Sequence, residues 1–123
     1  MKKMLKNSEV FNRLHSLKPL LTRNDMIGYI AARNYRFLSN SLVEYESIRV
    51  NLIKKYGEEG KDEHGTPAYT LKMDSPNFKA FCDELAPFNE MEHEVELMTA
   101  KYDDAAGKLT GEEILAVDWM LED

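Results

Sequence analysis

Three histidines and one cysteine are the residues of this chain best suited to bind a metal or to act as nucleophiles. His15, His64 and His93 lie far apart in the sequence, and no pair has the i, i+4 spacing that places two imidazoles on one helical face. Cys82 shares helical spacing with neighbouring apolar residues, where a cysteine normally behaves as a small buried hydrophobe. We therefore expect a core cysteine, no metal site, no cofactor and no catalytic residue.

One segment has glycine and carboxylates spaced like those of a calcium-binding loop. With Gly107 at the sixth position of such a loop, Asp104 falls at the third and Glu113 at the twelfth. Tyr102 and Ala106, however, occupy the first and fifth positions, so two oxygen ligands that the ion needs are absent. Glu113 is also explained as the last residue of a helix capping box. We expect a turn that leads into a capped helix and no calcium site.

Acidic residues dominate the segment that begins at Glu92. Charged and apolar residues alternate there with the period of a half-buried strand, which places the glutamates on one face of the strand. The candidate partner-binding site is an acidic surface formed by Glu92, Glu94, Glu96, Asp103 and Asp104. Such a surface could imitate DNA phosphates and occupy a basic groove on another protein. The alternative is a solvated strand face without a partner.

Basic and aromatic residues are interleaved in the first half of the chain. Arginines and lysines could follow a phosphate backbone there while the aromatic rings stack on bases. The periodicity favours a different interpretation, in which all of these aromatic residues form a buried helical stripe and the basic residues flank it, because Tyr35 and Tyr45 belong to the apolar series with helical spacing. Nucleic acid binding is therefore not expected. The residues concerned are Arg23, Arg33, Arg36, Arg49, Lys54 and Lys55, with Tyr29, Tyr35, Phe37 and Tyr45.

The distribution of charge along the chain is more informative than its total of -6. Residues 1–56 contain 11 lysines and arginines against 4 acidic residues, a net charge of +7. Residues 57–123 contain 5 against 18, a net charge of -13. Such asymmetry can indicate a nucleic-acid or acidic partner for one part and a basic partner for the other. The favoured interpretation is that the two halves lie against each other and partly neutralise their charges. The sequence predicts a basic helical half and an acidic α/β half.

The bulk composition is that of a single folded domain. A length of 123 residues with 43% apolar residues is sufficient for one hydrophobic core over residues 1–123. A single cysteine excludes an intrachain disulfide and favours a reducing compartment. The N-terminal residues lack the apolar stretch of a signal peptide, and no later stretch approaches the ~18 apolar residues of a membrane span. We expect a cytoplasmic protein without a membrane partner.

Helical periodicity predicts two helices in the basic half. The first begins at Ser8 and ends at Pro19, because the residue before a proline is pushed out of the helical region. The second runs from about Asp25 to Tyr56 and would be roughly 48 Å long. Its apolar stripe has spacings of three and four and consists of Ala31, Tyr35, Leu38, Leu42, Tyr45, Arg49, Leu52 and Tyr56.

The acidic half is predicted to contain a small sheet and two short helices. Residues 69–73 and 92–97 alternate as strands do and are expected to pair antiparallel. A helix between them ends at Pro87, and a capping box at Thr110 begins the last helix. The predicted fold is a mostly helical α+β domain with two N-terminal helices, of which the second is long, a two-stranded antiparallel sheet and a capped C-terminal helix.

The order of several segments resembles a family of small uncharacterised proteins, a domain of unknown function, that phages and prophages of chiefly Gram-positive bacteria encode. The resemblance carries no catalytic motif and implies no functional residue. It implies a setting in the bacterial cytoplasm during phage growth, or in a phage particle. The segments that carry it are residues 30–34, 52–57, 81–85, 92–97 and 109–123.

These observations together predict a non-enzymatic accessory protein that a phage encodes and that binds a host or phage protein. One specific form of this hypothesis is a host-defence inhibitor that acts through the acidic surface. The alternative is a minor virion structural or assembly protein that forms homo-oligomers through the long helix. An enzyme is disfavoured, because no set of residues meets the geometric tests of an active site.

Overall fold

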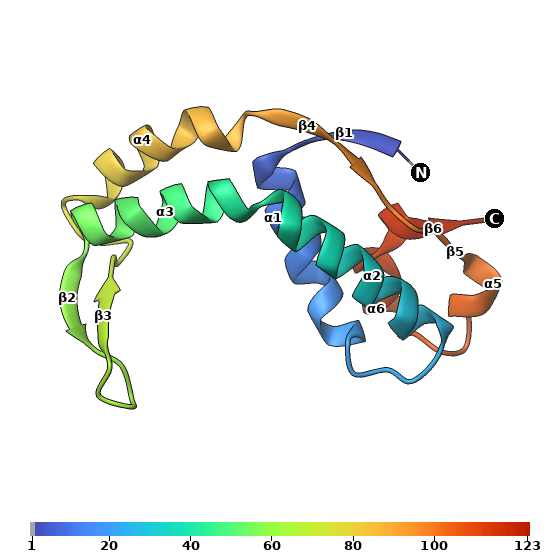
Figure 1. Cartoon of the computed structure of the whole chain (residues 1–123). Coiled ribbons are helices and arrows are strands. Elements are labelled where there is room, and N and C mark those ends of the chain that lie inside the picture. The colour runs from blue at the N-terminus through green and yellow to red at the C-terminus, as the bar shows by residue number, and fades with distance from the viewer. Residues whose placement is uncertain (1) are drawn as a thin grey trace. The chain divides into compact units, whose positions relative to one another are not determined.

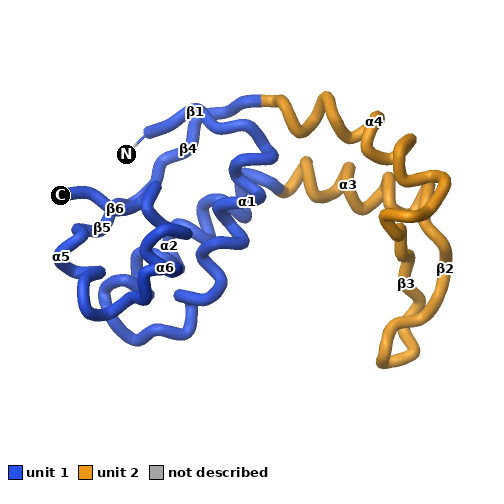
Figure 2. The backbone as a smooth tube through the Cα atoms, turned by 180° about the vertical axis from the view of Figure 1, so that it is seen from behind, with its two compact units in different colours: residues 1–42, 92–123 blue, residues 43–91 orange. Residues whose placement is uncertain are grey.

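The computed structural model describes residues 2–123 and contains helices and short strands in the order that Figure 1 shows. The chain divides into two compact units, which Figure 2 draws in different colours. Unit 1 comprises residues 1–42 and 92–123, and unit 2 comprises residues 43–91. The mostly helical α+β fold that the sequence predicts is confirmed.

Unit 1 is built on helices α1 (Asn7–Leu17) and α2 (Met26–Ser41), which pack on each other. A short 3-10 helix, η1 (Lys18–Leu20), follows α1 directly and contains Pro19. The C-terminal part of the chain completes the unit with short elements. The other elements of unit 1 are β1 (Lys2–Lys6), β4 (Glu92–Glu96), β5 (Ala100–Lys101), α5 (Tyr102–Ala105), α6 (Gly111–Ala116), η2 (Asp118–Met120) and β6 (Leu121–Glu122).

The antiparallel pair β1–β4 brings basic and acidic residues together. Lys2 lies opposite Glu96, and Lys6 lies opposite Glu92. Cross-strand pairs of opposite charge each contribute about 0.2–1 kcal/mol. Residues 1–42 carry eight lysines and arginines against two acidic residues, whereas residues 92–123 carry two against ten. Much of the charge asymmetry in the sequence is therefore balanced inside unit 1.

The strand pairing predicted from the sequence is wrong. Strand β4 pairs with β1, and strand β3 (Pro67–Thr70) instead forms an antiparallel hairpin with β2 (Glu58–Lys61). The sequence of β2 has no strand pattern, because its residues are charged or glycine, and none of them is buried in the structure. Three of the five residues of β1 are lysines, so its sequence does not alternate between apolar and polar residues as a half-buried strand does. Leu5 is its one buried residue.

The single long helix predicted for residues 25–56 is also wrong. Helix α2 ends at Ser41, and helix α3 (Val43–Tyr56) begins two residues later. At Leu42 the backbone N–H bonds to the carbonyl oxygen of Ser39, three residues back, at 3.2 Å. The hydroxyl of Ser41 donates to the carbonyl oxygen of Leu38 at 2.8 Å. The polar run Ser39 to Ser41 thus competes with the helical hydrogen-bond ladder and ends α2.

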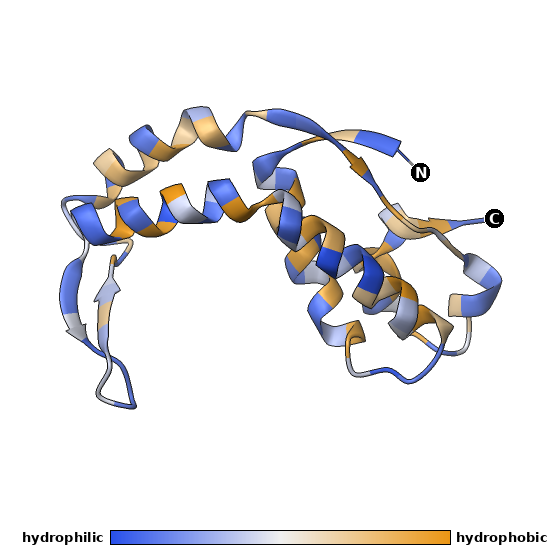
Figure 3. Cartoon of the chain, in the orientation of Figure 1, coloured by the Kyte–Doolittle hydropathy of each residue, from blue (hydrophilic) through white to orange (hydrophobic). Residues whose placement is uncertain are grey.

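Unit 2 consists of helix α3, the β2–β3 hairpin and helix α4 (Phe78–Asn89). Helices α3 and α4 pack on each other, and the Tyr45 hydroxyl donates a hydrogen bond to the Asn89 side-chain oxygen. Figure 3 shows that the turn of the hairpin is mostly hydrophilic. Helix α4 continues past Pro87, where the sequence predicts its end, and stops within two further residues.

The capped C-terminal helix is confirmed, although it is short. The Thr110 hydroxyl oxygen accepts a hydrogen bond from the Glu113 N–H at 3.2 Å, and a Glu113 carboxylate oxygen accepts one from the Thr110 N–H at 2.9 Å. These are the two bonds of a capping box. Helix α6 ends at Ala116, and the apolar residues that follow it form η2 and β6.

Candidate partner-binding surface

Helix α2 has one buried face and one exposed face that carries large side chains. Ile27, Ala31 and Leu38 are fully buried on the first face. The second face follows spacings of three and four, as one side of a helix does. Its six residues, which we call the α2 surface, are all exposed: Met26, Tyr29, Arg33, Arg36, Phe37 and Asn40. Met26, Tyr29 and Phe37 have exposed fractions of 59%, 55% and 41%.

The start of α2 is fixed by Asp25. A carboxylate oxygen of Asp25 accepts the N–H of Gly28 at 3.1 Å, and the Arg23 guanidinium forms an ion pair with Asp25 at 2.6 Å. The hydrogen bond from Arg23, followed by that from Gly28, lowers the pKa of Asp25. Gly28 packs closely on the preceding loop, because a Cβ atom there would lie 2.2 Å from the carbonyl oxygen of Arg23.

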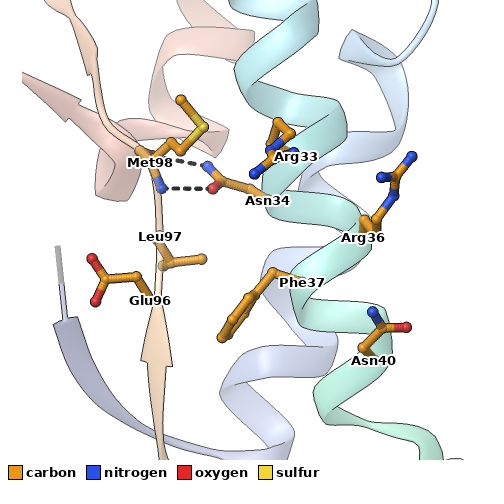
Figure 4. Close-up of a pocket in the computed structure, with 8 residues that line it drawn as sticks. All are labelled: Arg33, Asn34, Arg36, Phe37, Asn40, Glu96, Leu97 and Met98. Carbon is orange, nitrogen blue, oxygen red and sulfur yellow. Dashed lines mark hydrogen bonds between the residues drawn. The ribbon is translucent and has the colours of Figure 1, made fainter.

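Asn34 joins α2 to the segment that follows β4. Its side chain is buried, with 1% of the residue exposed. The Asn34 Nδ2 donates to the carbonyl oxygen of Met98 at 3.0 Å, and its Oδ1 accepts the Met98 N–H at 2.8 Å, as Figure 4 shows. One side chain thus satisfies both main-chain polar groups of Met98, as a neighbouring strand would. This pair holds the backbone of Met98 against α2.

A cavity of about 280 Å³ lies between α2 and the segment that Asn34 holds. The Phe37 ring points toward this segment, whereas the Glu96 carboxylate points away from α2, to the side of β4 where β1 lies (Figure 4). Arg33 and Arg36 are the positively charged residues of the lining, and in Figure 4 the Arg36 guanidinium points away from the segment of Glu96 to Met98. The lining residues are Arg33, Asn34, Arg36, Phe37, Asn40, Glu96, Leu97 and Met98.

Two of the aromatic residues predicted to be buried are exposed. Tyr45 is buried as the sequence predicts, but Tyr29 and Phe37 share the exposed face of α2 with Arg33 and Arg36. Tyr29 and Phe37 lie off the buried stripe of α2. A signal for the exposed face is nevertheless present in the sequence, because its residues have three-and-four spacing of their own.

The five acidic residues predicted as the binding site lie on two elements of unit 1. Glu92, Glu94 and Glu96 are exposed along β4, and Asp103 and Asp104 are exposed on α5. The first and last of the three glutamates lie opposite lysines of β1, and the middle one lies opposite an exposed methionine. The strand face is therefore less negative than its sequence indicates. The assignment of this surface to a partner stays a prediction.

The histidines and the cysteine lie on different elements of the chain. Cys82 is exposed, so its predicted place in the core is wrong; α4 buries Phe81 and Leu85, and Cys82 lies beside that face. His15 lies in α1, His64 in the hairpin turn and His93 in β4. Within residues 2–123, no group of three or more histidine, cysteine or acidic side chains is arranged to hold a metal ion. In the same range, no helix has the length and apolar character needed to span a membrane.

Comparisons of the chain with protein-family models, with curated proteins and with solved structures found no match.

Proposed function

We propose that this protein is a non-enzymatic protein that binds a protein partner through the α2 surface and the cavity beside it. The observation that carries this proposal is the exposure of Met26, Tyr29 and Phe37 together with two arginines on one helical face. Aromatic, methionine and arginine side chains are the types enriched in protein interfaces, and tyrosine and arginine often dominate binding energy. Large apolar side chains gathered on a surface mark interaction sites.

The framework of this surface is fixed before any partner arrives. The buried face of α2 packs in unit 1, and Asn34 holds the backbone of Met98 with two hydrogen bonds. A surface that is already ordered loses less conformational entropy when it binds. The cavity wall therefore supports binding to a defined segment of a partner.

The proposed setting is a bacterium in which a phage grows, or a phage particle. Its support is the resemblance of the sequence to small phage and prophage proteins. In this setting the partner is a host or phage protein, and inhibition of a host defence protein is one consequence that binding would have. The acidic surface on β4 and α5 is a second candidate interface, which the exposure of all five of its carboxylates favours.

Site-specific photo-crosslinking in a Gram-positive host tests this proposal. A photoreactive phenylalanine analogue is placed at Tyr29 or Phe37 in the full chain, with Tyr69 of unit 2 as the matched control, because Tyr69 and Phe37 are both 41% exposed. We expect one discrete crosslinked protein at positions 29 and 37 and none at 69. The same analogue placed at Glu94 and Asp104 tests the acidic surface, and crosslinks at these two positions alone would assign the interface to it. An absence of crosslinks at all five positions would contradict protein binding.

A further inference from the structure

We infer that the α2 surface binds an acidic segment of its partner, with an apolar side chain in the cavity and carboxylates on Arg33 and Arg36. This inference rests on the proposed function and adds the chemistry of the partner to it. Two observations support it: the two arginines of the α2 surface form no ion pair within residues 2–123, and the cavity has the size and lining for an apolar side chain.

The arginines of the α2 surface differ from the other arginines of the chain. Arg23 and Arg49 form ion pairs with Asp25 and Glu46, and Arg13 lies over the ring of Trp119 at 5.1 Å. Within residues 2–123, neither Arg33 nor Arg36 forms an ion pair or a hydrogen bond through its guanidinium. Guanidinium groups bind carboxylates with two parallel hydrogen bonds, so these two are available to an acidic partner.

The cavity has the size and lining for an apolar side chain of that partner. Its volume of about 280 Å³ lies below the ~300–1,000 Å³ that is typical of small-molecule sites. Its apolar walls include Phe37 and Met98, which remain 41% and 40% exposed. A methionine wall adapts readily to the shape of what it contacts. One large apolar side chain of a partner would cover both walls.

A protein segment fits this surface better than a nucleic acid does. Two arginines that contact phosphates release about two counterions. The logarithm of the binding constant for a single strand then falls with the logarithm of the salt concentration with a slope of only about -1.4. Tight binding to a phosphate backbone requires more contacts than this. The two arginines are the only positively charged residues that line the cavity, within residues 2–123. The exposed apolar residues, moreover, gain more from an apolar anchor in a peptide.

Selection from a displayed library of short random peptides against the immobilised full chain tests the inference. We expect the enriched peptides to be acidic and to share one aromatic or aliphatic residue.

Fluorescence anisotropy then measures the affinity of one enriched peptide. Arg33→Ala and Arg36→Ala should each weaken binding about 2- to 5-fold. The double variant Arg33→Glu, Arg36→Glu should enrich basic peptides instead. The control with the same charge change in unit 2, Lys54→Glu with Lys72→Glu, should leave the preference for acidic peptides intact.

The outcomes separate this inference from the proposed function. If Phe37→Ala abolishes binding of the peptide while reversal of both arginines has no effect, the inference is overturned and the proposed surface stands. If neither Phe37→Ala nor Met98→Ala changes binding, both fail. Enrichment of basic peptides, or of none, also overturns the inference. If a single-stranded oligonucleotide displaces the peptide from the wild type and does not bind the double arginine variant, the surface is assigned to nucleic acid.

Discussion

At the scale of single residues, Asn34 has the largest structural consequence. It is the one buried polar residue of the described chain, and it bonds to a residue 64 positions away. Asn34→Ala leaves the N–H and the carbonyl of Met98 without these partners, so we expect a loss of about 2–3 kcal/mol in the free energy of unfolding. Urea denaturation measures it. The control Asn40→Ala, on the exposed face of the same helix, should change stability by less than about 0.5 kcal/mol. Equal losses in the two variants would contradict the role of Asn34.

The Asp25 carboxylate gives a residue-scale prediction about pH. Its pKa is lowered in the folded protein by Arg23 and by the Gly28 N–H, so the folded state favours the charged form. Asp25 therefore stabilises the fold above the pKa of the unfolded chain, and this contribution is lost as pH falls through the lower pKa of the folded protein. Asp25→Asn keeps a capping side chain but removes the charge.

We expect Asp25→Asn to destabilise the protein near neutral pH and to match the wild type once Asp25 is protonated. Thermal unfolding across the acid range measures the difference between the two proteins. A difference that stays constant as pH falls would contradict the assignment, because the charge would then play no part.

At the scale of elements, features that depend on nearby residues could be predicted and features that depend on distant ones could not. The capping box at Thr110 and the buried side of α2 follow from local spacing. The pairing of β1 with β4 joins segments about 90 residues apart, and nothing in a strand of three lysines specifies its partner. The hydrogen bonds between Asn34 and Met98 also join distant residues, so the sequence does not predict them. It therefore does not predict the cavity wall that Met98 forms.

The end of α2 at Ser41 and the exposure of its aromatic residues show a second limit of local patterns. A three-and-four spacing continues through Leu42 in the sequence, although the hydroxyl of Ser41 bonds to the backbone and the helix stops. Two faces of one helix can also carry such a spacing, and Tyr29 and Phe37 belong to the exposed one. Periodicity identifies a face of a helix, but the contacts decide which face is buried.

The beginning of helix α2 supplies a prediction at this scale. Alanine normally stabilises a helix relative to glycine by about 1 kcal/mol. Gly28→Ala should do the opposite, because the new Cβ would lie 2.2 Å from the carbonyl oxygen of Arg23. Gly111→Ala, in the first turn of α6, meets no atom within 4 Å and should be neutral or stabilising. Melting temperatures compare the two, and a stabilised Gly28→Ala protein would show that the close approach is absent.

At the scale of the whole molecule, the hydrophobic core is divided unequally between the two units. The buried apolar residues of unit 2 are Tyr45, Phe81 and Leu85, whereas those of unit 1 come from most of its helices and from each of its strands. A unit with few buried apolar side chains opens more readily. We therefore expect the amides of α3 and α4 to exchange with solvent faster than those of α1 and α2. Hydrogen exchange with mass spectrometry measures this, and equal protection in both units would contradict it.

The central claim is that the α2 surface is the partner-binding surface of this protein. The most direct test is chemical-shift mapping of the ¹⁵N-labelled full chain during titration with the peptide enriched in the selection experiment. We expect the largest shift changes at the amides of Tyr29, Arg33, Phe37 and Met98, and little change in unit 2. Largest changes at Glu92, Glu94 and Glu96, on α5, or in the β2–β3 hairpin would contradict the claim.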